Sequence, residues 1–159
     1  MKVCFAILTE MKQTVPQVIA DFIDALPSQL RPYREMALNA VTRLFEDSAR
    51  RTPEGQVYLS TGDIPAMWLR DSSFQIKPLI RFSKDSEVYE FCAAVIARQA
   101  FYIAIDPYAN AFNPEPDGNC WHRDFADQSP WVFERKWEID SLASFLDISA
   151  SLAEVSGRT

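Results

Sequence analysis

Apolar residues recur at the spacing of a helix face in five stretches of this chain. Prolines and polar turns separate the stretches, and proline cannot continue a helix because it lacks the N–H donor. We therefore expect helices over residues 14–26, 32–51, 72–82, 86–103 and 139–152, and a short strand over 57–59. Thr14 would be the N-cap of the first helix. The pattern predicts a helical domain with long loops between some of its helices.

Composition and charge are those of a folded globular protein. Of the 159 residues, 48% are hydrophobic and 24% are charged, which suits a single domain. The net charge of −6 argues against a general nucleic-acid binder, because no basic excess exists to replace phosphate counterions. The apolar run Val3–Leu8 is short, and Glu10 and Lys12 follow it directly, so we expect no signal peptide. No apolar run approaches the roughly 20 residues of a membrane span, so no membrane partner is expected.

Cysteine, histidine and glycine are too few for several common kinds of site. The cysteines Cys4, Cys92 and Cys120 are scattered, and His122 is the single histidine. This spacing builds neither a zinc ligand set nor a disulfide framework, so we expect no metal and a reducing cytoplasm. A Cys120–His122 dyad is a minor alternative, because such partners ordinarily come from distant segments. Only four glycines occur and no phosphate loop or serine elbow is present, so we expect no cofactor.

The stretch over residues 61–72 interrupts the helical pattern. Its Thr-Gly-Asp start favours a turn, because glycine tolerates positive φ and Asp63 can bond its own backbone. Pro65 keeps the residue before it extended, so no helix can run through the stretch. Asp71 or Ser72 would then cap the next helix. The stretch is therefore expected to form a loop that ends at a helix N-terminus.

Trp68, Arg70 and Asp71 would lie on that loop, where side chains tend to face a cleft. An arginine fork beside a carboxylate suits the binding of vicinal hydroxyls, because one supplies donors and the other acceptors. A structural ion pair at a helix cap is equally compatible with these residues. The pair alone leaves both interpretations open.

Residues 106–130 form a long segment without helical periodicity. Segments of this length without regular structure are uncommon in compact domains and are often functional. Its histidine, His122, and its aromatic residues would line a site. A simple surface excursion is the alternative. The tryptophans between Trp121 and Trp137 would either pack in the core or stack on the faces of sugar rings.

Carboxylates gather before the last expected helix. Glu134 and Glu138 would share a helical face if that helix began early, and Asp140 follows them. Arg135 and Lys136 lie between the two glutamates and would hold nearby carboxylates ionised. The alternative is an acidic helix start that complements the macrodipole, with surface ion pairs around it.

Three segments together resemble a known family. Residues 60–72 (STGDIPAMWLRDS), 108–113 (YANAFN) and 130–142 (PWVFERKWEIDSL) are similar, in this order, to the motifs of glycoside hydrolase family 125. That family contains metal-independent exo-α-1,6-mannosidases. The resemblance covers the chain from about residue 14 onwards. It implies an all-α fold, the (α/α)6 barrel, with the active site where loops converge at one end.

The resemblance also implies roles for the site residues. Arg70 and Asp71 would hold hydroxyls of the terminal mannose, and Trp68 would form a wall of the pocket. Glu138 and Asp140 would line or brace the same subsite. With two loop residues, the expected substrate-binding set is Asp63, Trp68, Arg70, Asp71, His122, Glu138 and Asp140. The implied partner is a mannose-containing oligosaccharide or N-glycan.

The chain supplies only the first four or five helices of such a barrel. We therefore expect a single partial domain over residues 1–159, the N-terminal part of an inverting mannosidase that is inactive alone. Inversion needs an acid and a base across roughly 6.5–9.5 Å, and the resemblance implies that both lie outside this chain, so no catalytic residue is expected in it. A non-catalytic mannoside-binding module and a non-functional gene remnant are the alternatives. Missing neighbours would leave apolar helix faces exposed, and the chain would be marginally stable or self-associate through them.

Overall fold

The computed structural model describes residues 13–123 and 127–158. Residues 1–12 lie outside the described part. They include Cys4 and the apolar run that we did not expect to be a signal peptide. The helical elements are α1 (Gln17–Asp24), η1 (Ser28–Tyr33), α2 (Arg34–Arg43), η2 (Leu44–Ser48), α3 (Leu69–Ile76), η3 (Lys77–Phe82), α4 (Ser86–Ile105) and α5 (Ile139–Ser156). The strands are β1 (Ala49–Arg51), β2 (Val57–Leu59), β3 (Met67–Trp68), β4 (Ala111–Phe112) and β5 (Val132–Glu134).

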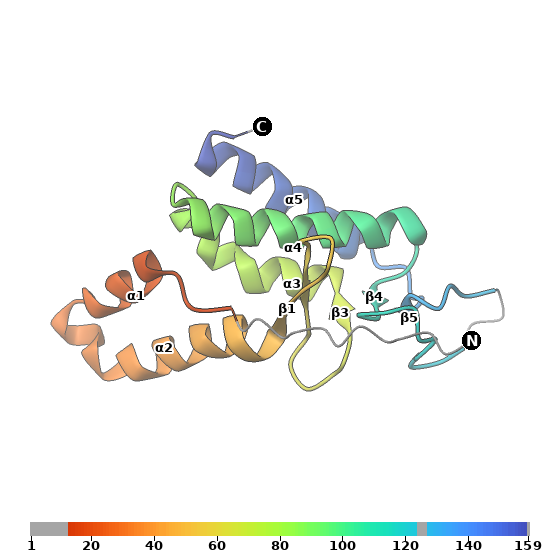
Figure 1. Ribbon diagram of the computed structural model, residues 1–159, viewed down its shortest axis with the longest axis horizontal. Helices are drawn as coiled ribbons and strands as arrows, with labels where there is room; N and C mark the ends of the chain where they lie inside the picture. Colours follow the sequence, from red (N-terminus) through yellow and green to blue (C-terminus); the bar gives the residue numbers. More distant parts are fainter. Residues whose placement is uncertain (1–12, 124–126, 159) are drawn as a thin grey trace.

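Three helices make the body of the protein. The helices α3 and α5 run side by side in the same direction, and α4 runs antiparallel to them (Figure 1). The helices α1 and α2 form an arm at one end, while β4 and β5 lie at the other end (Figure 1). The fold is therefore mainly helical, as the periodicity predicts.

Two small antiparallel sheets accompany the helices, so the fold is mostly helical but not purely so. Strand β2 pairs with β1 in a hairpin, which confirms the strand expected over residues 57–59. Strands β3, β4 and β5 form a second sheet in that order. These strands have two or three residues each, too few for an alternating pattern to show in the sequence. The second sheet joins the three segments that carry the family motifs.

Several helix boundaries differ from those expected. Pro16, and not Thr14, is the N-cap of α1, and no side-chain cap bond is formed there. The second expected helix divides into η1, α2 and the π-turn η2, so that its last expected residues, Arg50 and Arg51, lie in β1. Asp85 caps α4: its Oδ1 accepts hydrogen bonds from the amides of Glu87 and Val88 at 3.0 and 3.2 Å.

The start of α3 also differs, and the difference bears on the site. The helix begins at Leu69 directly after β3, with Trp68 as an extended N-cap and no side-chain cap bond. Neither Asp71 nor Ser72 is the cap. Arg70 and Asp71 therefore lie in the first turn of a helix instead of on a loop. The short strand explains this: it holds Trp68 extended, so the helix can start one residue later.

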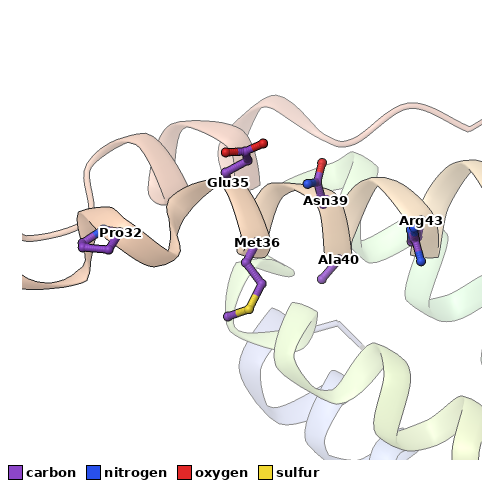
Figure 2. Close-up of a pocket in the computed structure, with 6 residues that line it drawn as sticks. All are labelled: Pro32, Glu35, Met36, Asn39, Ala40 and Arg43. Atoms are coloured by element: carbon purple, nitrogen blue, oxygen red, sulfur yellow. The ribbon is translucent and has the colours of Figure 1, made fainter.

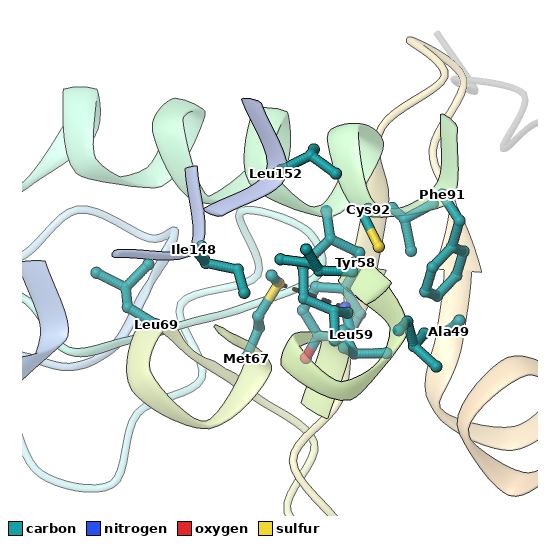
Figure 3. Packing of buried hydrophobic residues seen from close by; sticks show 14 of the residues in the cluster. Ala49, Tyr58, Leu59, Met67, Leu69, Phe91, Cys92, Ile148 and Leu152 are labelled. Carbon is teal, nitrogen blue, oxygen red and sulfur yellow. Dashed lines mark hydrogen bonds between the residues drawn. The ribbon is translucent and has the colours of Figure 1, made fainter. Parts of the chain in front are cut away.

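The core lies between α4, α5, β2 and the β3–α3 junction (Figure 3). Leu59, Met67 and Leu69 are fully buried there, and Phe91 and Ile148 pack into the same cluster. Met67 also accepts a hydrogen bond through Sδ from the amide of Leu59 at 3.3 Å. The motif segment over residues 61–72 thus has one side in the core, which fixes the direction in which its polar side points.

Helix α4 is the single helix of the described part that is long and apolar enough to cross a membrane by length and composition. Polar residues interrupt its sequence, so it contains no uninterrupted apolar run of that length. Its buried face includes Arg98 and Gln99 beside apolar residues. It lies at the centre of the helical body, and central helices of folded domains commonly have this composition.

Helix α5 carries an exposed apolar stripe on one face. The stripe consists of residues spaced by four and three positions: Ile139, Ala143, Leu146, Ala150 and Ala153. Ile139 is 72% exposed and Leu146 is 66% exposed. We call this set the α5 stripe. It fits the expectation that apolar helix faces of this chain would be open to solvent.

Candidate functional site

Arg70 is the centre of an ionic cluster. Its Nη1 donates hydrogen bonds to Oε2 of Glu138 at 3.2 Å and to Oδ2 of Asp140 at 3.1 Å. Its Nη2 donates to Oδ2 of Asp71 at 3.3 Å. All of these side chains keep part of their surface in water. The guanidinium therefore orients three carboxylates at an accessible place.

The fold brings these residues together because two helix starts lie side by side. Arg70 and Asp71 are in the first turn of α3, Glu138 is the N-cap of α5, and Asp140 is in its first turn. Helix α3 follows β3 directly, and α5 begins shortly after β5 ends. Strand β4 lies between β3 and β5 in the sheet. Carboxylates are favourable near helix N-termini, where amides point outward.

A second layer of contacts holds the β5 side of the cluster. Lys136 Nζ lies 3.0 Å from Oε1 of Glu138. The Lys136 amide donates to Oδ1 of Asn110, and Asn110 Nδ2 donates to Oε2 of Glu134 at 2.6 Å. Asn110 is only 1% exposed, so its amide group is fixed by these contacts. The six charged groups comprise two cations and four carboxylates.

The ionic contacts raise the pKa of both cations. The hydrogen bond to Asp140 is the main cause that raises the pKa of Arg70, and the charges of Asp71 and Glu138 add to it. The hydrogen bond to Glu138 is the main cause that raises the pKa of Lys136. Both groups therefore stay charged at neutral pH, and the cluster presents fixed donors and acceptors.

Aromatic rings extend from Trp68, the residue just before α3. Trp68 packs edge-on against Phe133, with ring centroids 5.7 Å apart, and Phe133 also contacts Trp121 at 5.8 Å. Trp121 is held by its amide, which donates to the carbonyl of Phe133 at 2.9 Å, yet 57% of the residue is exposed. Trp137, next to Glu138, is also exposed. Flat exposed rings beside polar groups suit contact with the apolar faces of a sugar.

The structure brings together five of the seven residues expected to bind substrate. Arg70 contacts Asp71, Glu138 and Asp140, and Trp68 directly precedes α3. The other two, Asp63 and His122, are exposed on separate loops. The turn expected before Trp68 is present: Gly62 has a φ of 60°, and the Ile64 amide bonds the carbonyl of Thr61 at 3.1 Å. The substrate-binding roles of all seven residues remain predictions.

Two details of the site were not foreseen. Glu134 and Glu138 do not share a helical face, because Glu134 ends β5 and Glu138 is the N-cap of α5. Asn110 was not expected to connect the site, although it lies within a motif segment. A buried asparagine in an irregular segment must find hydrogen-bond partners, and this requirement could have singled it out had its burial been known.

Within the described residues, no group of three or more His, Cys, Asp or Glu side chains is placed to hold a metal ion. A surface hollow of about 550 Å³ lies elsewhere, along α2, at the far end of the molecule from β4 and β5 (Figures 1 and 2). Its lining residues are Pro32, Glu35, Met36, Asn39, Ala40 and Arg43. It is wide open and contains none of the groups of the Arg70 cluster.

The family of the chain follows from its match to a family profile. The profile of the metal-independent alpha-mannosidases (GH125) matches residues 23–159. The chain belongs to this family. The match includes every residue of the Arg70 cluster, and it confirms the family to which the motifs pointed.

Two relatives of this GH125 chain are informative. The meiotically up-regulated gene 157 protein of Schizosaccharomyces pombe is 32% identical over 148 residues, which are 86% of this chain and 29% of that protein. A metal-independent alpha mannosidase of Streptococcus pneumoniae, solved in a non-productive complex with alpha-1,6-mannobiose, is 31% identical with a TM-score of 0.83. That match covers 94% of this chain and 36% of the solved chain. The chain thus spans about a third of the length of these relatives.

Proposed function

We propose that the Arg70 cluster binds the terminal mannose of an α-1,6-linked mannoside, the non-reducing end of an oligosaccharide or N-glycan. The observation that carries this proposal is the contact of one guanidinium with three carboxylates where α3 and α5 begin. Support also comes from the mannobiose bound to the structural relative.

The chemistry of the cluster suits a polyhydroxyl ligand. Each sugar hydroxyl can donate one hydrogen bond and accept others, so it is satisfied best by cations and carboxylates set side by side. Arg70 and Lys136 supply donors, while Asp71, Glu138 and Asp140 supply acceptors. Charge-assisted hydrogen bonds of this kind are stronger than neutral ones. Trp68 and Trp121 would flank the ring of the sugar.

We also propose that this chain binds the sugar without cleaving its glycosidic bond. Glu138 and Asp140 bond the same nitrogen, Nη1 of Arg70. The distance between the two bonded oxygens therefore cannot exceed the sum of the two hydrogen-bond lengths, 3.2 and 3.1 Å. That separation is below the roughly 6.5–9.5 Å that inverting enzymes leave for substrate and water. The guanidinium also occupies the space between the two carboxylates.

Hydrolysis with inversion and without a metal would then need carboxylates that this chain does not contribute. We propose that α3, α4 and α5 correspond to part of an (α/α)6 barrel and that the remainder carries the acid and the base. The close likeness to the pneumococcal mannosidase, of which this chain covers 36%, supports this arrangement.

Calorimetric titration tests the binding proposal. We expect the chain to bind α-1,6-mannobiose and to bind maltose, an isomeric glucose disaccharide, much more weakly. Absence of any heat with mannobiose would count against a sugar site and would favour a non-functional remnant. In a parallel assay, we expect no mannose to be released from mannobiose. Release by the chain alone would return Glu134, Glu138 and Asp140 to consideration as catalytic groups.

A further inference from the structure

Arg98 is a buried cation. It lies on the core face of α4 and is 3% exposed. Among the described residues, no carboxylate lies within ion-pair distance of it. A buried charge is costly unless other groups replace its hydration. The groups that do so here indicate what Arg98 holds in place.

Three aromatic rings surround the Arg98 guanidinium. Its central carbon lies 4.5 Å from the ring centroid of Tyr102, 4.8 Å from that of Phe101 and 5.0 Å from that of Trp131. Such contacts attract a cation, and more strongly when water is excluded. Phe101 and Tyr102 belong to α4 itself, whereas Trp131 comes from the far end of the long loop. The guanidinium therefore ties this loop end to the helix.

Hydrogen bonds from the same guanidinium reach the near end of the loop. Nη2 of Arg98 donates to the carbonyl of Pro114 at 2.8 Å, and Nη1 donates to Oε1 of Gln56 at 3.4 Å. The neighbouring Tyr102 hydroxyl donates to the carbonyl of Asn113 at 2.5 Å. Burial raises the pKa of Tyr102 to about 12, so this hydroxyl stays a donor at neutral pH.

From Asn113 the contacts continue to Trp121. Asn113 Nδ2 donates to the carbonyls of Asn119 and Pro130 at 2.8 and 3.0 Å. The Gly118 amide also donates to Pro130, and the Trp121 amide donates to Phe133. The segment 113–121 is thus fastened at its start by Arg98 and Tyr102, and at its end by β5.

We infer that Arg98 is a positioning residue that holds the segment 113–121 so that Trp121 stands against Phe133, whose ring also contacts Trp68 at the start of α3. Lysine would keep the charge at this position, but it lacks the planar fork that bonds Pro114 while stacking among the three rings. The role therefore depends on the guanidinium and not on charge alone. The consequence for mannoside binding rests on the proposed function, whereas the consequence for the segment does not.

Amide hydrogen exchange tests the inference on the whole chain. In Arg98→Lys, we expect the amides of Gly118 and Trp121 to exchange about tenfold faster, because the segment opens more often. The amide of Ile148 in α5 should keep its rate. Tyr102→Phe, which removes only the bond to Asn113, should accelerate the same two amides to a smaller extent.

Arg81→Lys is the matched control, because Arg81 also lies over aromatic rings, those of Phe22 and Phe82, but is exposed and far in sequence from the segment. It should leave Gly118 and Trp121 unchanged. The inference is overturned if Arg98→Lys leaves these two amides unchanged. It is also overturned if Ile148 accelerates equally, since Arg98 would then stabilise the fold in general.

Titration with α-1,6-mannobiose gives the second readout. We expect Arg98→Lys to weaken binding severalfold while Arg81→Lys binds like the unmodified chain. Unchanged affinity in Arg98→Lys, with faster exchange at Trp121, would show that the segment does not contribute to the sugar site. If the unmodified chain fails to bind mannobiose, the proposed function fails, and the exchange experiment still decides the positioning role.

Discussion

Nη1 of Arg70 lies 3.1 Å from Oδ2 of Asp140, and these residues are 70 positions apart in the chain. Seven residues further along, Nζ of Lys77 lies 2.8 Å from Oδ2 of Asp147, again 70 positions apart. The constant offset shows that α3 and its continuation η3 run parallel to α5. Only the first pair belongs to the candidate site, so the second pair provides a control for it.

Replacing Arg70 should abolish most of the mannobiose affinity. Arg70→Met removes the donor fork and leaves Asp71, Glu138 and Asp140 to repel one another. We expect binding to weaken by at least tenfold, or about 1.4 kcal/mol, in calorimetric titration. Asp147→Asn should bind mannobiose like the unmodified chain. Equal affinity of Arg70→Met and Asp147→Asn would exclude the cluster as the sugar site.

The Lys77–Asp147 pair should contribute little to stability. Both side chains are about half exposed, and exposed ion pairs contribute roughly 0.2–1 kcal/mol. Asp147→Asn is therefore expected to lower the free energy of urea unfolding by no more than this, and added salt should reduce the difference. A loss of several kcal/mol would mean that the pair has a structural role that its exposure does not suggest.

Truncation of the core under the site should be much more costly. Leu59 is fully buried beside Met67, and a buried Leu→Ala change ordinarily costs roughly 2–5 kcal/mol. We expect Leu59→Ala to lower the unfolding free energy by an amount in this range. Leu38→Ala, at a position that is 42% exposed on α2, is the matched control and should cost far less.

Stability should fall at alkaline pH because of Cys92. Burial raises the pKa of Cys92 to about 12, whereas a thiol in the unfolded chain titrates near roughly 8.5. Between these values the unfolded state has lost a proton that the folded state keeps. The free energy of unfolding should therefore be constant below about pH 8 and fall by up to roughly 1.4 kcal/mol per pH unit above about pH 9.

Urea unfolding at a series of pH values measures this slope. Burial also raises the pKa values of Tyr58 and Tyr102, and these groups contribute as the pH nears about 10, the ordinary range of tyrosine. A series from about pH 7 to 9.5 therefore reports mainly on the thiol. Cys92→Ala should remove the slope, whatever its effect on stability at neutral pH. Cys120→Ala, at a partly exposed thiol, should retain it. A slope that persists in Cys92→Ala would assign it to another group.

The α5 stripe should make the chain self-associate at high concentration. Leu146 and Ile139 expose most of their surface, and contiguous apolar faces of this kind are characteristic of interaction sites. We expect sedimentation velocity to show concentration-dependent association that Leu146→Glu reduces. Leu38→Glu, which places the same charge on α2, should not. A monomer at all concentrations that also unfolds cooperatively would contradict the expectation.

The sequence could predict the features that depend on neighbours along the chain. The helical periodicity located α4 and α5, and the strand at β2 was expected. The assignment of Arg70 and Asp71 to one site rested on motif resemblance, and the structure places both in the cluster. The start of α3 was missed because a two-residue strand, which no local pattern reveals, fixes it.

Other features depend on contacts between distant segments. Arg98 has the helical spacing of the core residues Val95 and Tyr102, so its burial could be inferred, but its aromatic partner Trp131 could not. Asn110 likewise acquires its role only when β4 lies beside β5. A side chain gives no sign in the sequence of a partner that lies twenty or more residues away.

By itself, the sequence determined the helical character of the chain, its family and the residue types at the proposed sugar site, because periodicity and motifs are local properties. The tertiary structure decided that Glu138 and Asp140 share one nitrogen of Arg70. That geometry follows from the parallel packing of α3 and α5, which only burial of their common face can fix. It agrees with the proposed role of the cluster in holding a sugar, because both carboxylates are already bound to the cation between them.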